Sequence, residues 1–88
     1  MNKKPKKKKL RQYDRTLIAL NENRTTWMAL HDLAAWMYIR FNKKDSEAGI
    51  SARIRDIRKD LEAEGETIKG KKPKNKNAFV YKIMVLEA

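Results

Sequence analysis

The stretch Ile50-Ser51-Ala52-Arg53-Ile54-Arg55-Asp56-Ile57-Arg58-Lys59-Asp60-Leu61 decides how the rest of the chain is interpreted. Its apolar residues Ile50, Ile54, Ile57 and Leu61 are separated by four, three and four positions, which places them in one stripe of an α-helix. The opposite side of that helix carries Ala52, Arg55, Asp56 and Lys59, and the two flanks carry Arg53 and Arg58. One side of the helix therefore suits a hydrophobic core, and the other suits a polar ligand or solvent.

A helix with this exposed side can enter the major groove of DNA. Its small residues allow a close approach, and its arginines reach phosphates or guanine edges. The alternative is an ordinary surface helix, because arginine and lysine are good helix formers. The charge of the flanking segments favours the first interpretation.

The positive charge of the chain is concentrated in two blocks. The 88 residues include 22 Lys and Arg against 11 Asp and Glu, a net charge of +11. Residues 1–11 hold seven basic and no acidic residues, residues 69–82 hold six and none, and the segment between them is nearly neutral. Solubility alone does not require two such blocks, whereas a polyanion such as nucleic acid would bind to them.

The composition argues against several other classes of function. The chain has no cysteine and a single histidine, His31, so we expect neither a disulfide nor a metal site, and no cofactor. It has no glycine-rich phosphate loop and no carboxylate pair in apolar surroundings, so we do not expect an enzyme. No apolar run approaches the roughly 20 residues that span a bilayer, and no secretory signal is present. We therefore expect an intracellular protein that does not interact with a membrane.

Residues 1–9 form a lysine-rich segment that we expect to be a disordered arm. Like charges so close together do not fold alone, but they can follow the phosphates of DNA. The lysines that we assign to this contact are Lys4, Lys6, Lys7, Lys8 and Lys9. The alternative is a tail that only keeps the protein in solution.

Apolar periodicity predicts two helices before the quoted stretch, at about residues 9–22 and at Met28–Phe41. Residues 24–27 lie between the two helices and are rich in strand-forming residues, so we expect a short strand there. Alternatively, Thr25 or Thr26 caps the second helix. Trp27 and Trp36 occur at helical spacing among aliphatic residues. We expect them in the core rather than stacked on bases.

The third helix is expected to begin at a cap formed by Asp45 or Ser46, with Ser51 as the alternative, and to end near Glu64 before Gly65. Two strands follow, at residues 66–69 and 78–86, joined by the basic, turn-rich loop 70–77. A helix, a short strand, two helices and a basic hairpin is the order of a winged helix-turn-helix. We therefore expect an α+β fold, with one domain at residues 10–88 after the arm.

Two motifs resemble those of the small phage and prophage winged-helix DNA-binding proteins. The first is Arg53-Ile54-Arg55-Asp56-Ile57-Arg58-Lys59 with the later Gly65 and Ile68, and the second is Phe79-Val80-Tyr81. The third helix is about one turn longer here than in those proteins, because residues 60–64 precede the glycine. The resemblance implies a transcriptional regulator or an architectural factor in the cytoplasm of a bacterial or phage-infected cell.

We therefore expect a double-stranded DNA-binding protein whose third helix enters the major groove and whose hairpin and arm contact the backbone. Double-stranded DNA is expected rather than RNA, because the major groove of RNA is too narrow for a helix. The residues assigned to the contact on the third helix and the hairpin are Ser51, Arg53, Arg55, Arg58, Lys59, Lys71, Lys72, Lys74 and Lys76. The alternative is a module that docks on a host protein through the same fold. A monomer and a homodimer are both compatible with the sequence.

Overall fold

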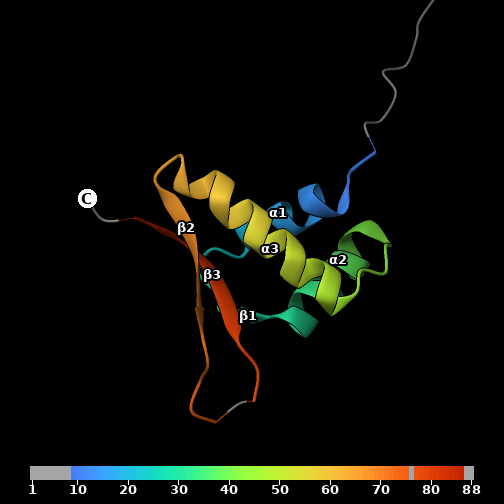
Figure 1. Cartoon of the computed structure of the whole chain (residues 1–88). Helices are drawn as coiled ribbons and strands as arrows, with labels where there is room; N and C mark the ends of the chain where they lie inside the picture. Colours follow the sequence, from blue (N-terminus) through green and yellow to red (C-terminus); the bar gives the residue numbers. More distant parts are fainter. Residues whose placement is uncertain (1–8, 76, 87–88) are drawn as a thin grey trace, which may run out of the picture.

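The computed structural model describes residues 9–75 and 77–86, which form three helices and a three-stranded antiparallel sheet (Figure 1). The elements are α1 (Gln12–Glu22), β1 (Met28–Ala29), α2 (Leu30–Phe41), α3 (Glu47–Glu62), β2 (Glu66–Lys71) and β3 (Val80–Val85). The strand order is β1-β3-β2, so the last strand of the chain lies in the middle of the sheet. This confirms the predicted α+β class and the C-terminal hairpin. Within the described ranges, no helix has the length and apolarity needed to cross a membrane.

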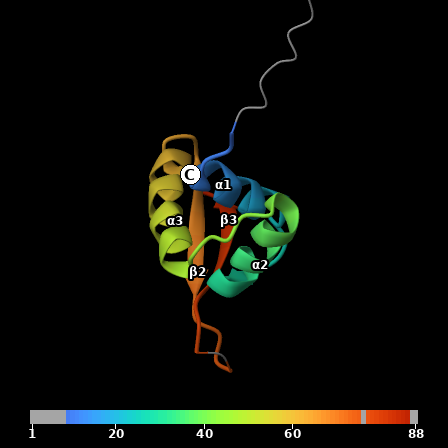
Figure 2. The ribbon, with the colours of Figure 1, turned by 90° about the vertical axis from the view of Figure 1, so that its right-hand side faces the viewer.

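The helices lie on one face of the sheet, as two views of the ribbon show (Figures 1 and 2). The register of β2 and β3 pairs Ile68 with Ile83 and Lys69 with Lys82. Since successive side chains of a strand point to opposite faces, these two pairs lie on different faces of the sheet. The isoleucines are buried beneath the helices, and the lysines lie on the other face, which we call the outer face.

The core forms where the helices meet the inner face of the sheet. All four residues of the predicted stripe of α3 are buried, which confirms the periodicity that identified this helix. Leu33 and Met37 of α2 are completely buried, as is Ala19 of α1. The helical stripe is thus the side of α3 that holds the domain together, and the opposite side is left for other contacts.

Several predicted boundaries are wrong by a few residues at the N-terminal side. α1 begins at Gln12 rather than near residue 9, because the Asp14 carboxylate accepts a hydrogen bond from the Arg11 amide at 2.9 Å. The short strand is Met28–Ala29 rather than residues 24–27, because Met28 pairs with Tyr81 at the other end of the chain. Asp32, rather than Thr25 or Thr26, caps α2 by accepting from the Ala29 amide at 3.0 Å.

The start and end of α3 are also settled by local contacts. Ser46 is confirmed as the cap, since its Oγ accepts from the Gly49 amide at 3.0 Å, and the alternative caps Asp45 and Ser51 are wrong. α3 ends at Glu62, two residues earlier than predicted. Gly65 then adopts a φ of 89°, a left-handed conformation that favours glycine. Both strands differ from their predicted ranges, because pairing extends β2 to Lys71 and starts β3 at Val80.

The two tryptophans do not lie inside the core. Trp36 packs against its edge and makes an edge-to-face contact with Phe41, with ring centroids 6.0 Å apart. Trp27 is half-buried and lies beneath the ammonium groups of Lys71 and Lys82, at 4.2 and 5.5 Å from the ring centroid. The predicted core position is therefore right only in part for Trp36 and wrong for Trp27, which precedes a strand rather than lying in a helix.

Candidate nucleic-acid interface

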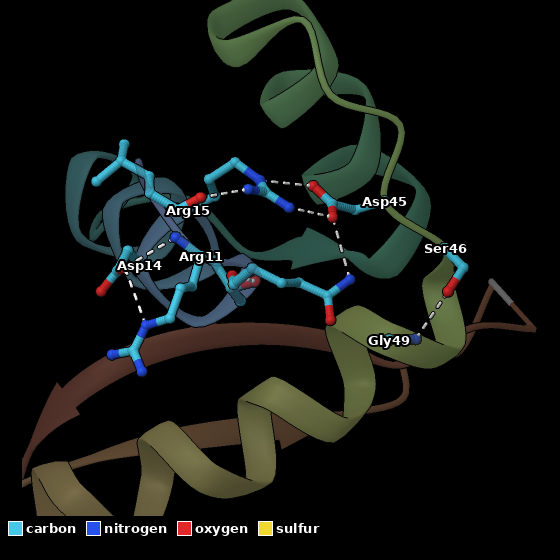
Figure 3. A network of polar contacts seen from close by, with 9 residues as sticks. Arg11, Asp14, Arg15, Asp45, Ser46 and Gly49 are labelled. Atoms are coloured by element: carbon cyan, nitrogen blue, oxygen red, sulfur yellow. Dashed lines mark hydrogen bonds and ion pairs between the residues drawn. The ribbon is translucent and has the colours of Figure 1, made fainter. Parts of the chain in front are cut away.

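An ion pair joins α1 to the residue that precedes the cap of α3 (Figure 3). Arg15 donates to the Asp45 carboxylate through Nη2 at 2.7 Å and Nε at 3.0 Å, and Gln12 Nε2 donates to the same carboxylate at 3.1 Å. The side chains of Arg15 and Asp45 are only 11% and 5% exposed. The bond from Arg15 lowers the pKa of Asp45, and the same bond raises the pKa of Arg15. Since Asp45 directly precedes the Ser46 cap, this pair positions the N-terminus of α3.

Gly49 allows α1 and α3 to approach closely at this point. A Cβ atom at position 49 would lie 2.5 Å from Nε2 of Gln12, the side chain that also binds Asp45. A larger residue would therefore displace Gln12 or move the first turn of α3. Glycine is intrinsically unfavourable inside a helix. It is needed at position 49 because any side chain there would collide with Gln12.

Two further contacts hold the second half of α3 against the sheet. Arg58 donates from Nε to the carbonyl oxygen of Ile68 at 2.9 Å. The Thr67 hydroxyl donates to the Glu62 carboxylate at 2.7 Å. Glu62 thus has a structural role that offsets its unfavourable place at the negative end of the helix. α3 is held at both ends, so its exposed side has a defined orientation.

The exposed side of α3 combines small residues in its first half with cations in its second. Ala48, Ala52, Arg55 and Lys59 follow one another at spacings of four, three and four; Ala52 is half-buried and the other three are exposed. All seven arginines of the chain lie within the described residues, and Arg55 is the one that has no hydrogen bond, ion pair or ring contact there. Its guanidinium is therefore available to a ligand.

A cleft between α3 and the hairpin brings together several of the predicted residues. Ser51, Ile54, Arg55 and Arg58 line it from α3. The hairpin contributes Gly70, Phe79 and Tyr81, and Phe79 is exposed. Ser51, Arg55 and Arg58 thus share one site, in which Arg58 is already bonded to the backbone of β2.

Arg53 is not part of this cleft, although it belongs to the same predicted set. It lies on the opposite flank of α3, where its Nε is 3.0 Å from Asp56, and it lines a hollow with Tyr13 and Asp60. The Tyr13 hydroxyl donates to Asp60, and this bond, burial and the nearby carboxylates raise the pKa of Tyr13 to about 12. The carboxylates make this flank of α3 less favourable for phosphate than the cleft.

The lysines near the cleft lack acidic partners. Among residues 9–75 and 77–86, no carboxylate lies within ion-pair distance of Lys59 or of the described hairpin lysines, which are Lys69, Lys71, Lys72, Lys74 and Lys82. Lys71, assigned to the loop, is the last residue of β2 and contacts Trp27. Lys9 is exposed, whereas Lys4, Lys6, Lys7, Lys8 and Lys76 lie outside the described residues, as does the predicted disorder of residues 1–8.

Lys69 and Lys82 were not among the predicted contact residues, and Trp27 was expected in the core rather than on the surface. Their shared surface depends on the pairing of β2 with β3 and on the approach of residue 27, so the local sequence carries no signal for it. The described part of the chain contains no group of three or more His, Cys, Asp or Glu that could hold a metal ion.

No protein-family model, curated protein or solved structure matches this chain.

Proposed function

We propose that this chain is a double-stranded DNA-binding protein with a winged helix-turn-helix fold, in which α3 enters the major groove. The observation that supports this most directly is the distribution of unpaired cations. Arg55, Lys59 and the loop lysines Lys72 and Lys74 have no carboxylate partner among the described residues, as is also true of Lys43 and Lys44 before α3. Outside α3, each arginine has one, and these are Arg11, Arg15, Arg24 and Arg40.

The shape of α3 supports a direct approach to base edges. Ala48 and Ala52 add little bulk to the first half of its exposed side, so the helix backbone can come close to the groove floor. Arg55, one turn later, has the fork geometry that pairs with the O6 and N7 atoms of guanine. Ser51 and Arg58 line the cleft side of the helix, and in this proposal they contact phosphates.

The hairpin and the N-terminal segment supply contacts that do not depend on sequence. Lysine ammonium groups are point charges on flexible stems and bind phosphate without reading bases. In this proposal Lys72, Lys74 and Lys76 bind the adjacent backbone or minor groove, and the lysines of residues 1–9 follow the phosphates beyond. The motifs around Arg53–Lys59 and Phe79–Tyr81 support a regulator of transcription or an architectural factor of a phage or prophage.

The experiment that tests the proposal is selection of bound duplexes from a random pool, followed by mobility-shift titration of the selected sequences at several salt concentrations. We expect guanine to be enriched at one position or more. We also expect the logarithm of the affinity to fall with the logarithm of salt concentration by about 0.9 for each phosphate contacted. Failure to bind any duplex at low salt would contradict the proposal.

Docking on a host protein is a second candidate, and the surface of α2 favours it. Tyr38 and Ile39 are 51% and 84% exposed, and neighbouring apolar side chains on a surface can mark a protein interface. Binding through such a surface would change little with salt concentration, in contrast to the counterion release that accompanies DNA binding. The same titration therefore distinguishes the two candidates.

A further inference from the structure

The outer face of the sheet carries a second group of cations. Lys69 and Lys71 of β2 alternate with Gly70, and Lys82 of β3 is paired directly with Lys69, so all three lysines belong to the outer face. In Figure 1 the helices lie on the opposite side of β2 and β3 from this face. We call Lys69, Lys71 and Lys82 the outer-face lysines.

This arrangement is unfavourable for the fold itself. Like charges directly opposite one another on two strands are destabilising. Within the described ranges, no carboxylate lies within ion-pair distance of the outer-face lysines. The ammonium groups of Lys71 and Lys82 instead converge on the ring of Trp27, at 4.2 and 5.5 Å from its centroid. An indole ring attracts cations but leaves their net charge in place, so the face remains strongly positive.

We propose that the outer-face lysines form a second DNA-binding surface, which holds the backbone of a second duplex while α3 and its cleft hold the first. This inference rests on the proposed function. It makes the protein a bridge between two DNA segments, with one hairpin lying between them.

The two faces of the hairpin place the two surfaces apart. Gly70 and Tyr81 are paired with each other across β2 and β3, and both line the cleft with α3. The outer-face lysines alternate with these residues along the strands and therefore point to the opposite face. A duplex that occupies the cleft lies on one face of the hairpin and leaves the other face open to a second duplex.

The chemistry of the outer face favours duplex DNA over a single strand. Single-strand binding uses free aromatic faces on which unstacked bases stack. Trp27 is half-buried and Lys71 already lies over its ring, so it offers no free face of that kind. What the surface presents is a set of ammonium groups, which bind phosphates regardless of sequence.

A bridging assay tests this inference with the full-length protein. A duplex is immobilised on beads, protein is bound to it, and retention of a second, labelled duplex is measured per molecule of bound protein. We expect the natural protein to retain the second duplex. The variant Lys69→Gln/Lys82→Gln should retain roughly tenfold less near physiological salt, because it lacks two phosphate contacts. Its affinity for a single duplex should be nearly unchanged. Its thermal midpoint should change little, because the repulsion between the two lysines and the contact of Lys82 with the Trp27 ring are lost together.

The matched control is Lys43→Gln/Lys44→Gln, which removes the same charge from two exposed residues between α2 and α3. Retention per bound protein should stay at the natural level in this control, and an equal loss there would overturn the inference. Undiminished bridging by the Lys69→Gln/Lys82→Gln variant would also overturn it. So would a variant that retains less of a labelled single strand but as much of the labelled duplex as the natural protein. If the natural protein binds the immobilised duplex but never retains a second one, the second surface alone is refuted. If it does not bind the immobilised duplex, both proposals fail.

Discussion

The arginines outside α3 and the cations of α3 and the hairpin have different surroundings. Arg15 is buried against Asp45, Arg40 is bonded to Glu22 at 2.9 Å, and Arg11 lies 3.6 Å from Asp14. Arg55 and Lys59 have no such partner among the described residues, although they belong to the same small domain. The arginines outside α3 are thus paired with carboxylates, whereas within the described ranges Arg55 of α3 is not.

In the proposed function, this difference separates charges that serve the fold from charges that contact DNA. A cation that is buried or constrained needs a partner, because its desolvation otherwise costs free energy. An exposed cation needs none and remains available to phosphate. Arg53 and Arg58 lie between the two groups, since Arg53 is paired with Asp56 and Arg58 is bonded to the Ile68 carbonyl. The comparison therefore predicts which substitutions change stability and which change binding.

The largest effect on stability is expected from Asp45→Asn. The substitution leaves the Arg15 guanidinium buried without a negative partner, and we expect it to lower the free energy of unfolding by about 3 kcal/mol. Urea denaturation monitored by circular dichroism measures this loss. The neighbouring substitution Lys44→Gln is the control, because Lys44 is exposed and should change stability little.

The pH dependence of this effect has a defined sign. Arg15 lowers the pKa of Asp45 in the folded state, so the stabilisation is complete above the pKa that Asp45 has in the unfolded chain. It is lost as the pH falls through the lowered pKa of the folded state. The difference in stability between the natural protein and Asp45→Asn should therefore shrink in acid. A difference that stays constant down to strongly acidic pH would show that the charge of Asp45 is not what stabilises the fold.

The next largest effect concerns the preference for one base pair. Arg55→Ala removes an exposed side chain with no partner, so the unfolding free energy should change by no more than about 0.5 kcal/mol. The preference at one base position should fall by about 1–3 kcal/mol, the value of a bidentate contact with guanine. Competition between selected and single-base-altered duplexes measures this change.

Arg53→Ala is the control for Arg55→Ala. It removes an arginine from the same helix, but from the flank where Asp56 binds it. We expect this variant to keep the base preference of the natural protein. If the two variants lose the same preference, the distinction between paired and unpaired arginines does not predict the DNA contacts.

The order and type of the elements could be predicted from the sequence because their signals are local. The spacing of Ile50, Ile54, Ile57 and Leu61 identified α3 and its buried side, and all four residues are buried. Ser46 was predictable as a cap because its hydroxyl reaches an amide only three residues later. The basic hairpin was predictable because its turn-forming residues and its β-branched strand adjoin in the chain.

The contacts that position the site could not be predicted, because their partners are distant in sequence. Arg15 and Asp45 are 30 positions apart, and nothing in either segment indicates the other. The displacement of β1 to Met28–Ala29 likewise depends on its pairing with β3. Trp27 was expected in the core because helical spacing was assumed for it, whereas the lysines above it come from the hairpin. The separation of Arg53 from the cleft follows from the same distant packing.

A smaller effect is expected for the lysines of the hairpin loop. Lys72→Ala/Lys74→Ala removes two exposed cations that have no carboxylate partner among the described residues. The slope of log affinity against log salt should become shallower by about 2, with roughly tenfold weaker binding near physiological salt. All duplex sequences should be affected alike, because phosphate contacts carry no base information. A loss confined to selected sequences would assign base readout to the hairpin.

The smallest effect is expected where a pair is exposed, and it tests whether pairing or burial determines stability. Arg40 Nη1 lies 2.9 Å from Glu22, but the two side chains are 50% and 45% exposed. Arg40 also lies 5.5 Å from the Trp36 ring centroid, so a single substitution would mix two contacts. A double-mutant cycle of Arg40→Gln and Glu22→Gln isolates the ion pair. Its coupling energy should be about 0.2–1 kcal/mol and should decrease at high salt, because exposed charges are screened. The corresponding cycle for Arg15 and Asp45 should give a larger and less salt-dependent value. If both cycles gave the same coupling energy, the burial of the Arg15–Asp45 pair would not be what sets it apart.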